Sequence, residues 1–102
     1  MAGHTPTKVR LALVDLGEHL RTWRKLNGLS QEMLAARADL SAQTVRGIEN
    51  GTGTVSTENL LRVTHVLGLL DGLITSTDPL NSPVGRARAN ERLPQRVRRS
   101  AA

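Results

Sequence analysis

The side chains best suited to chemistry in this sequence lie between residues 41 and 50, where they are spaced as on a short helix. Val45 and Ile48 are three residues apart, so both would lie on the inner face of that helix. Four residues would then point outward: Ala42, Gln43, Arg46 and Gly47. Amide and guanidinium groups near the start of a protruding helix suit hydrogen bonding to base edges in the DNA major groove. Gln43 can donate to N7 of adenine and accept from its N6 amine, whereas Arg46 can reach guanine or a phosphate.

The elements that would position these residues are two short helices joined by a tight turn. Ser30 can cap the first helix and Ser41 the second, because a serine oxygen accepts a hydrogen bond from an otherwise unpaired N–H of the first turn. The apolar residues of the first helix share one face: Leu34, Ala35 and Ala38. Residues 39–41 form the turn, and Gly51 ends the second helix.

This pattern resembles the Cro/XRE family of helix-turn-helix DNA-binding domains over roughly residues 16–74. Three motifs found together carry the resemblance, namely RKLNGLSQ, LAARADLS and VRGIENG. The resemblance implies an all-α protein with a compact five-helix, lambda-repressor-like domain at residues 15–75. We expect an N-terminal arm at residues 1–14 and a flexible, Arg-rich tail at residues 76–102.

The resemblance also implies roles for single positions. Gln31 matches a glutamine that binds a backbone phosphate, and residues 50–54 match a loop that donates hydrogen bonds to phosphate. The positions implied to contact DNA are Gln31, Ser41, Ala42, Gln43, Thr44, Arg46, Gly47, Asn50, Thr52 and Thr54. Gly47 departs from the family pattern, in which a longer, base-contacting side chain is common. We expect either a close backbone approach there or the loss of direct readout.

Two charged residues match a buried pair of the family. Arg24 and Glu49 would tie the first helix to the end of the recognition helix, and their role would be structural. The alternative is two unconnected surface charges.

The segment before the first motif allows two interpretations. Asp15 with Glu18 three residues later forms a capping-box pattern, which favours a helix start at Asp15. Residues 8–14 could instead form a strand or a longer helix. The apolar stripe that follows is Leu16, Leu20 and Trp23, and Gly28 would end the helix. We expect Trp23 at the edge of the core, where its indole N–H can find a partner.

A fourth helix begins after Ser56, which can cap it, and its residues Leu60, Val63 and Leu67 would face the core. More leucines follow than one small domain can bury on one face. We therefore predict a homodimer contact made by Leu67, Leu69, Leu70, Leu73 and Ile74. The alternative is a fifth helix packed wholly on its own domain. A symmetric dimer would read a palindromic operator with half-sites about 34 Å apart.

The net charge of +5 is concentrated near the C-terminus. Residues 8–75 hold eight basic and seven acidic residues, whereas residues 76–102 hold six arginines and two acidic residues. Ser82-Pro83 predicts the start of a short helix that reaches about Arg92 and is stopped by Pro94. The order of a Cro/XRE domain, LGLLDGL and an Arg-rich end resembles HipB-like antitoxins, which implies an autoregulating repressor that also binds a HipA-like kinase toxin through this tail. A solvated tail is the simpler alternative.

Other classes of protein are disfavoured by composition. The chain has no cysteine, and His4, His19 and His65 are widely separated, so we expect no enzyme, metal or cofactor. No apolar run approaches a membrane span and no signal peptide is evident, so we expect a cytoplasmic, nucleoid-associated protein. The rival functions are a stand-alone, phage-type regulator whose tail clamps DNA, and an RNA-associated protein. The single aromatic residue weighs against single-strand recognition.

Overall fold

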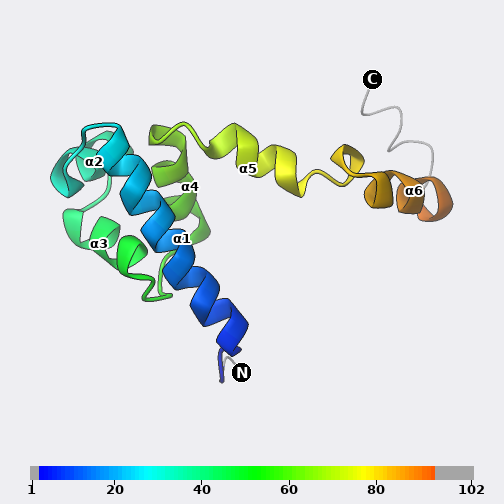
Figure 1. The fold of residues 1–102 in the computed structure, drawn as a ribbon, viewed down its shortest axis with the longest axis horizontal. Helices are drawn as coiled ribbons and strands as arrows, with labels where there is room; N and C mark the ends of the chain where they lie inside the picture. Colours follow the sequence, from blue (N-terminus) through cyan, green and yellow to red (C-terminus); the bar gives the residue numbers. More distant parts are fainter. Residues whose placement is uncertain (1–2, 94–102) are drawn as a thin grey trace. The chain divides into compact units, whose positions relative to one another are not determined.

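A computed structural model describes residues 3–93, and every regular element among them is helical. The elements are α1 (Thr7–Leu26), α2 (Gln31–Ala38), α3 (Ala42–Asn50), α4 (Thr57–Val66), α5 (Leu70–Thr77), the 3₁₀ turn η1 (Pro79–Asn81) and α6 (Pro83–Arg92) (Figure 1). The all-α prediction is therefore confirmed for this part of the chain. Residues 3–93 contain six α-helices rather than five, because α6 lies in the segment predicted as a tail. The chain divides into two compact units, residues 1–70 and residues 71–102.

Helix α1 begins at Thr7, so the predicted start at Asp15 is wrong. Pro6 occupies the N-cap position, and residues 7–14, predicted as an arm, are helical. The longer helix proposed for residues 8–14 is the correct alternative. Tertiary contact accounts for the extension: the loop after α3 lies so close that a Cβ on Gly51 would be 2.9 Å from the carbonyl carbon of Leu13. Asp15 lies inside the helix and caps nothing.

The closest approach of α1 to α3 is at Gly17, which is buried. A Cβ at this position would lie 2.6 Å from the carbonyl oxygen of Ile48, so a side chain there would force the two helices apart. Helix α1 ends at Leu26, and Gly28 follows with a φ of +72°, a left-handed conformation that glycine adopts without strain. The predicted stop at Gly28 is confirmed.

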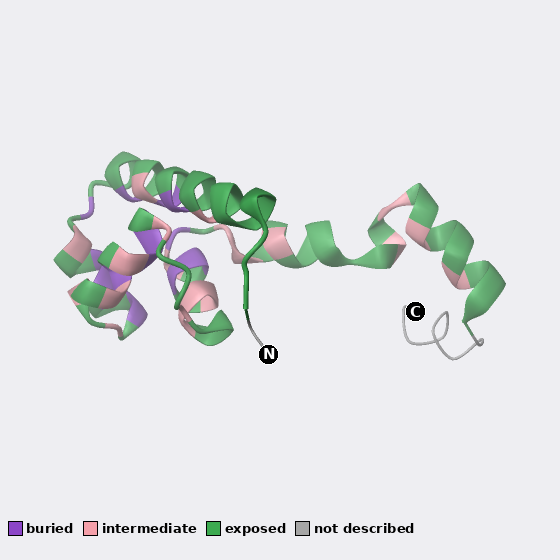
Figure 2. Ribbon diagram, turned by 90° about the horizontal axis from the view of Figure 1, so that it is seen from below, coloured by how far each residue is buried: buried purple, intermediate pink, exposed green. Residues whose placement is uncertain are grey.

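The core of the first unit lies among α1, α2, α3 and α4 (Figure 2). Its four most deeply buried large side chains come one from each helix: Leu20, Leu34, Val45 and Val63. Trp23 is not part of it, because 44% of this residue is exposed. The core is thus built from aliphatic side chains.

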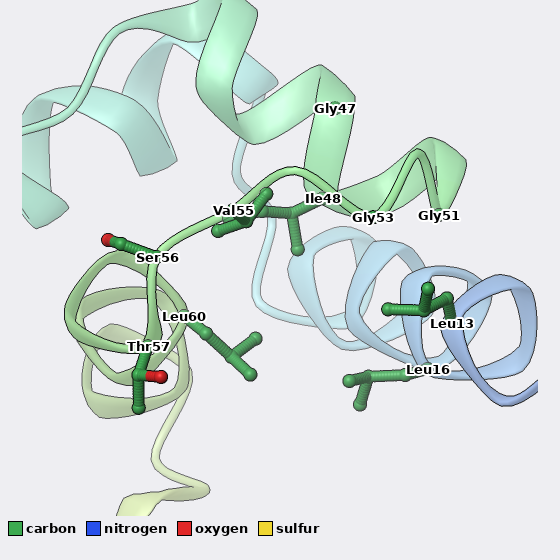
Figure 3. Close-up of a pocket in the computed structure, with 10 residues that line it drawn as sticks. All are labelled: Leu13, Leu16, Gly47, Ile48, Gly51, Gly53, Val55, Ser56, Thr57 and Leu60. Carbon is green, nitrogen blue, oxygen red and sulfur yellow. The ribbon is translucent and has the colours of Figure 1, made fainter. Parts of the chain in front are cut away.

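A small apolar pocket remains between α1, the end of α3 and the start of α4 (Figure 3). Its volume is about 110 Å³, and Leu13 and Leu16 of α1 lie across from Leu60 of α4. None of its ten lining residues carries an ionisable side chain. The pocket therefore offers no acid or base for catalysis, and its wall belongs to the packing of the domain.

Helix α4 begins as predicted, because the Ser56 hydroxyl accepts a hydrogen bond from the N–H of Asn59. Leu67, at the end of this helix, is only 5% exposed and belongs to the core, and Leu69 packs against it. Leu67 is therefore not available as a dimer contact, and that part of the prediction is wrong. The predicted contacts at Leu69, Leu70, Leu73 and Ile74 stay predictions. Helix α5 buries no residue. The alternative of a fifth helix packed wholly on its own domain stays a prediction.

In the second unit, α6 matches the predicted short helix. The Ser82 hydroxyl accepts a hydrogen bond from the N–H of Gly85, Pro83 is the first helical residue, and the helix ends at Arg92. Pro94, the predicted stop, lies outside the described residues. The turn η1 lies directly against α6, because a Cβ on Gly85 would be 2.6 Å from the carbonyl carbon of Pro79. No residue of α6 is buried.

Candidate nucleic-acid interface

Local sequence signals set the position of α3 relative to α2. Ser30 caps α2 by accepting a hydrogen bond from the N–H of Met33. Asp39 ends that helix in the left-handed conformation, with a φ of 58°. Ser41 then caps α3, accepting from the N–H of Thr44, while the two hydroxyls lie 2.9 Å apart. The predicted helix, turn and helix are all confirmed.

Helix α3 has one anchored face and one free face. Val45 and Ile48 are buried, which confirms the predicted inner face. Gln43 and Arg46 are exposed, and within residues 3–93 neither side chain takes part in a hydrogen bond or ion pair. Their donors are therefore available to an external ligand. Ala42, predicted to point outward, instead is partly buried and packs against the core.

An open polar hollow lies along this free face. Its lining includes eight of the ten predicted DNA-contacting residues, together with two that sequence reasoning missed. The ten lining residues are Ser41, Gln43, Thr44, Arg46, Gly47, Asn50, Thr52, Thr54, Val55 and Asn59. Asn59 is in the first turn of α4, and no local signal relates it to α3. Only the packing of α4 brings it to this surface.

The loop after α3 is folded back onto the helix. Thr52 donates hydrogen bonds to the carbonyl oxygen of Gly47 from both its N–H (3.2 Å) and its hydroxyl (3.1 Å). A Cβ on Gly47 would lie 3.3 Å from that hydroxyl oxygen. The backbone at Gly47 therefore approaches Thr52 closely, as one of the two predicted explanations for this glycine requires.

Behind α3, Arg24 and Glu49 form the predicted buried pair. The guanidinium of Arg24 donates to both carboxylate oxygens, from Nε at 2.7 Å and from NH2 at 3.1 Å. Its remaining nitrogen donates to the carbonyl oxygen of Leu29 at 2.9 Å. Arg24 is 8% and Glu49 2% exposed. This bidentate pair joins α1 to the end of α3 and rules out two unconnected surface charges.

Two residues predicted to contact DNA also belong to this network. Gln31 donates from Nε2 to Glu49 at 3.0 Å. Asn50 accepts a hydrogen bond from Arg21 at 2.8 Å, and Arg21 Nε lies 3.4 Å from Glu49. Gln31 does not line the hollow, so in this conformation its amide helps to hold α2 against α3. Five side chains from three helices thus fix the end of α3.

The network also changes the acidity of Glu49. Burial raises the pKa of this carboxyl, but hydrogen bonds from Arg24 and Gln31 and the charge of Arg24 outweigh it, so the pKa lies below its ordinary value. Glu49 is consequently ionised near neutral pH, and its charge stays paired inside the fold.

The chemistry available elsewhere in the described residues is limited. Residues 3–93 contain no cluster of three or more histidine or acidic side chains that could hold a metal ion. None of the helices in this part of the chain combines the length and apolar character needed to cross a membrane.

A family model described as helix-turn-helix matches residues 20–71, a range that runs from the middle of α1 into α5. It includes all of the turn between α2 and α3 and all five side chains of the polar network behind them. No curated protein matches the chain.

Proposed function

The chain belongs to the Cro/XRE-type helix-turn-helix family of DNA-binding transcription regulators, and we propose that it reads a specific duplex sequence through α3. One observation carries this proposal: α3 is anchored by Val45 and Ile48 while Gln43 and Arg46 have no partner within residues 3–93. A bidentate amide or guanidinium contact to a base edge discriminates by about 1–3 kcal/mol. Gln43 therefore reads adenine, and Arg46 binds guanine or a phosphate.

The polar residues around the hollow support a backbone-binding role. Ser41 and Thr44 lie at the N-terminus of α3, where the helix dipole favours an anion. Asn50 is the last residue of α3, and Thr52 and Thr54 follow it, so these residues can contact phosphates on the other side of the groove. The first unit carries little net positive charge. The groups that contact phosphate are therefore mainly neutral hydrogen-bond donors.

The test is binding to a duplex that covers the region upstream of the protein's own gene, measured by fluorescence anisotropy. Gln43→Ala and Arg46→Ala should each weaken binding about 10- to 100-fold, the equivalent of one lost bidentate contact. Arg37→Ala is the matched control, because this arginine is exposed and lies outside the hollow. Unchanged affinity for the duplex in the double variant Gln43→Ala/Arg46→Ala would contradict the proposal that α3 reads the DNA sequence.

Salt dependence separates the two roles of Arg46. If it binds phosphate, Arg46→Ala should reduce the slope of log affinity against log salt by about 0.9, with every sequence affected alike. If it binds guanine, the variant should lose discrimination at one base pair and keep the slope. An affinity independent of salt in the wild type would contradict duplex binding altogether.

We further propose that the protein is a dimeric repressor with a palindromic operator, acting at the nucleoid. A single α3 covers few base pairs, and two copies related by a two-fold axis double the site. Mutating one half-site should weaken binding far more than mutating a flanking base pair. Equal effects of the two changes would argue for a monomer.

The finer proposal is an antitoxin role in which the C-terminal segment binds a HipA-like kinase toxin. Its support is α6, which carries three arginines against one glutamate and exposes Val84, while the exposed Leu93 follows its end. A helix with no buried residue, one exposed valine and an exposed leucine just after it suits binding to a partner. Co-expression with the product of the neighbouring gene tests it: a stable complex and rescue of growth are expected, and neither would appear if the protein acts alone.

The second candidate is a stand-alone regulator whose tail clamps DNA. Deleting residues 76–102 discriminates between the two. Lost operator affinity with a smaller salt slope supports the clamp, because six arginines are removed. Unchanged DNA binding with loss of the protein complex supports the antitoxin.

A further inference from the structure

Helix α1 carries a row of apolar residues and one histidine that its own domain leaves exposed. Successive residues of this row are alternately three and four positions apart along α1. We call the row the α1 seam, and its members are Val9, Ala12, Leu16, His19, Trp23 and Leu26. All six are exposed. The exposed fractions of the four largest apolar ones are 48% for Val9, 37% for Leu16, 44% for Trp23 and 70% for Leu26.

The α1 seam is distinct from the face that holds the domain together, except at Leu16, which also lines the apolar pocket. The buried row is formed by Gly17, Leu20 and Arg24. Because each residue of a helix is rotated by about 100° from the last, this row lies roughly 100° around the helix from the seam. Figure 2 shows the outer side of α1 exposed along its length. Spacing of three and four over 18 residues is the pattern by which one helix packs along another, so the geometry calls for a helical partner.

We propose that the α1 seam is a homodimer interface in which the α1 helices of two copies pack antiparallel. The proposal deepens the dimer of the proposed function by naming its surface, and it holds whether or not the protein binds DNA. It replaces the predicted contact at residues 67–74, of which Leu67 and Leu69 are engaged with their own core.

The occupant is a second copy because the seam is complementary to itself when reversed. Antiparallel pairing sets Val9 opposite Leu26 of the other copy, Ala12 opposite Trp23, and Leu16 opposite His19. The smallest residue of the seam thus faces the largest, as interdigitating helices require. Parallel pairing would set alanine against alanine and tryptophan against tryptophan, which leaves a gap at one level and crowding at another.

Two further features fit this arrangement. The first turns of α1 run beyond α2, α3 and α4 (Figure 1), so antiparallel packing offsets the two domain bodies along the helix axis. Contact over ~26 Å between helices ~10 Å wide buries on the order of 1,000 Å² in total, at the lower end of specific interfaces. The dimer should therefore be weak and should dissociate on dilution.

Sedimentation equilibrium of the full chain tests the surface. The wild type should shift from 11.0 kDa towards twice that mass as its concentration rises. Val9→Glu and Leu26→Glu should each keep it monomeric, because each sets two carboxylates within the apolar seam. Both side chains are well exposed, and circular dichroism checks that the variants stay folded.

Matched controls use exposed apolar residues off the seam. Leu11→Glu lies off the seam, about 110° around the same helix, where 60% of the residue is exposed. Ile74→Glu is in α5, where 56% of the residue is exposed. Both should dimerise like the wild type. A wild type that stays monomeric, or dimers lost in Ile74→Glu but kept in the two seam variants, would overturn the proposal.

Cysteine crosslinking tests the direction of the two helices, because the chain has no native cysteine. Val9→Cys alone and Leu26→Cys alone should not crosslink, since like positions are ~26 Å apart in the antiparallel pair. A mixture of the two should give a disulfide-linked heterodimer. Crosslinking of either variant with itself, or no link in the mixture while dimers are present, would refute antiparallel pairing. DNA binding by the same variants is measured separately, so loss of the dimer is distinguished from loss of the reading surface.

Discussion

Replacing Arg24 by alanine should lower the free energy of unfolding by about 3 kcal/mol. Breaking a buried pair costs about 3–5 kcal/mol because one charge stays buried without its partner. The lower end applies here, since Glu49 keeps hydrogen bonds from Gln31 at 3.0 Å and Arg21 at 3.4 Å. With a urea dependence of about 1.5 kcal/mol per molar, expected for a domain of this size, the unfolding midpoint should fall by about 2 M.

The loss in the free energy of unfolding is measured by urea unfolding, with circular dichroism as the signal. Lys25→Ala removes an exposed cation from the next position of α1 and should change stability little. Arg24→Met combined with Glu49→Leu should recover much of the loss, because it removes both charges together. A cooperative transition of Arg24→Ala within about 0.5 M of the wild-type midpoint would refute the view that this pair holds α1 to α3.

Two further predictions concern Glu49 and Gly17. Because the folded state lowers the pKa of Glu49 below 4.5, its contribution is complete above that pH and disappears as pH falls through the folded pKa. Urea unfolding at several pH values should show Glu49→Gln losing less stability on acidification than the wild type; parallel losses would contradict this. Gly17→Ala should destabilise by about 1–3 kcal/mol, because its Cβ would overlap the backbone of Ile48 and Glu49. Gly72→Ala, with nothing within 4 Å of the added Cβ, should cost no stability, and equal thermal shifts would argue against the close approach.

Sequence signals that act within a few residues were enough to predict the helix N-caps. Ser30, Ser41 and Ser56 each accept the hydrogen bond that a serine before a helix predicts, and Ser82 does the same before Pro83. A capping serine bonds only to the first turn of its own helix, so the prediction of a cap does not depend on the rest of the fold. The inner face of α3 followed in the same way from the spacing of Val45 and Ile48.

The start of α1 shows where a local signal fails. Asp15 and Glu18 have the spacing of a capping box, yet the helix passes through them and begins at Thr7. The loop at Gly51 packs against the backbone of Leu13 and favours the longer helix. A contact between residues 38 positions apart cannot be read from the sequence around either of them.

The apolar residues of the sequence did not predict which surfaces of the fold stay exposed. The leucine run predicted a contact at residues 67–74, but Leu67 completes the core. Trp23, expected at the edge of the core, is 44% exposed. Because α1 carries apolar residues on two faces, only its packing against α3 determines which face is buried and which remains for a partner.

The sequence by itself determined the helix-turn-helix, its caps and the pairing of Arg24 with Glu49, because short-range hydrogen bonding and a specific motif specify them. Tertiary structure alone decided that Asn59 joins the polar hollow and that Gln31 and Asn50 are tied into the network at Glu49. It also decided that the outer face of α1 is left uncovered. These features depend on which distant helices meet, and that is settled by the packing of the whole core.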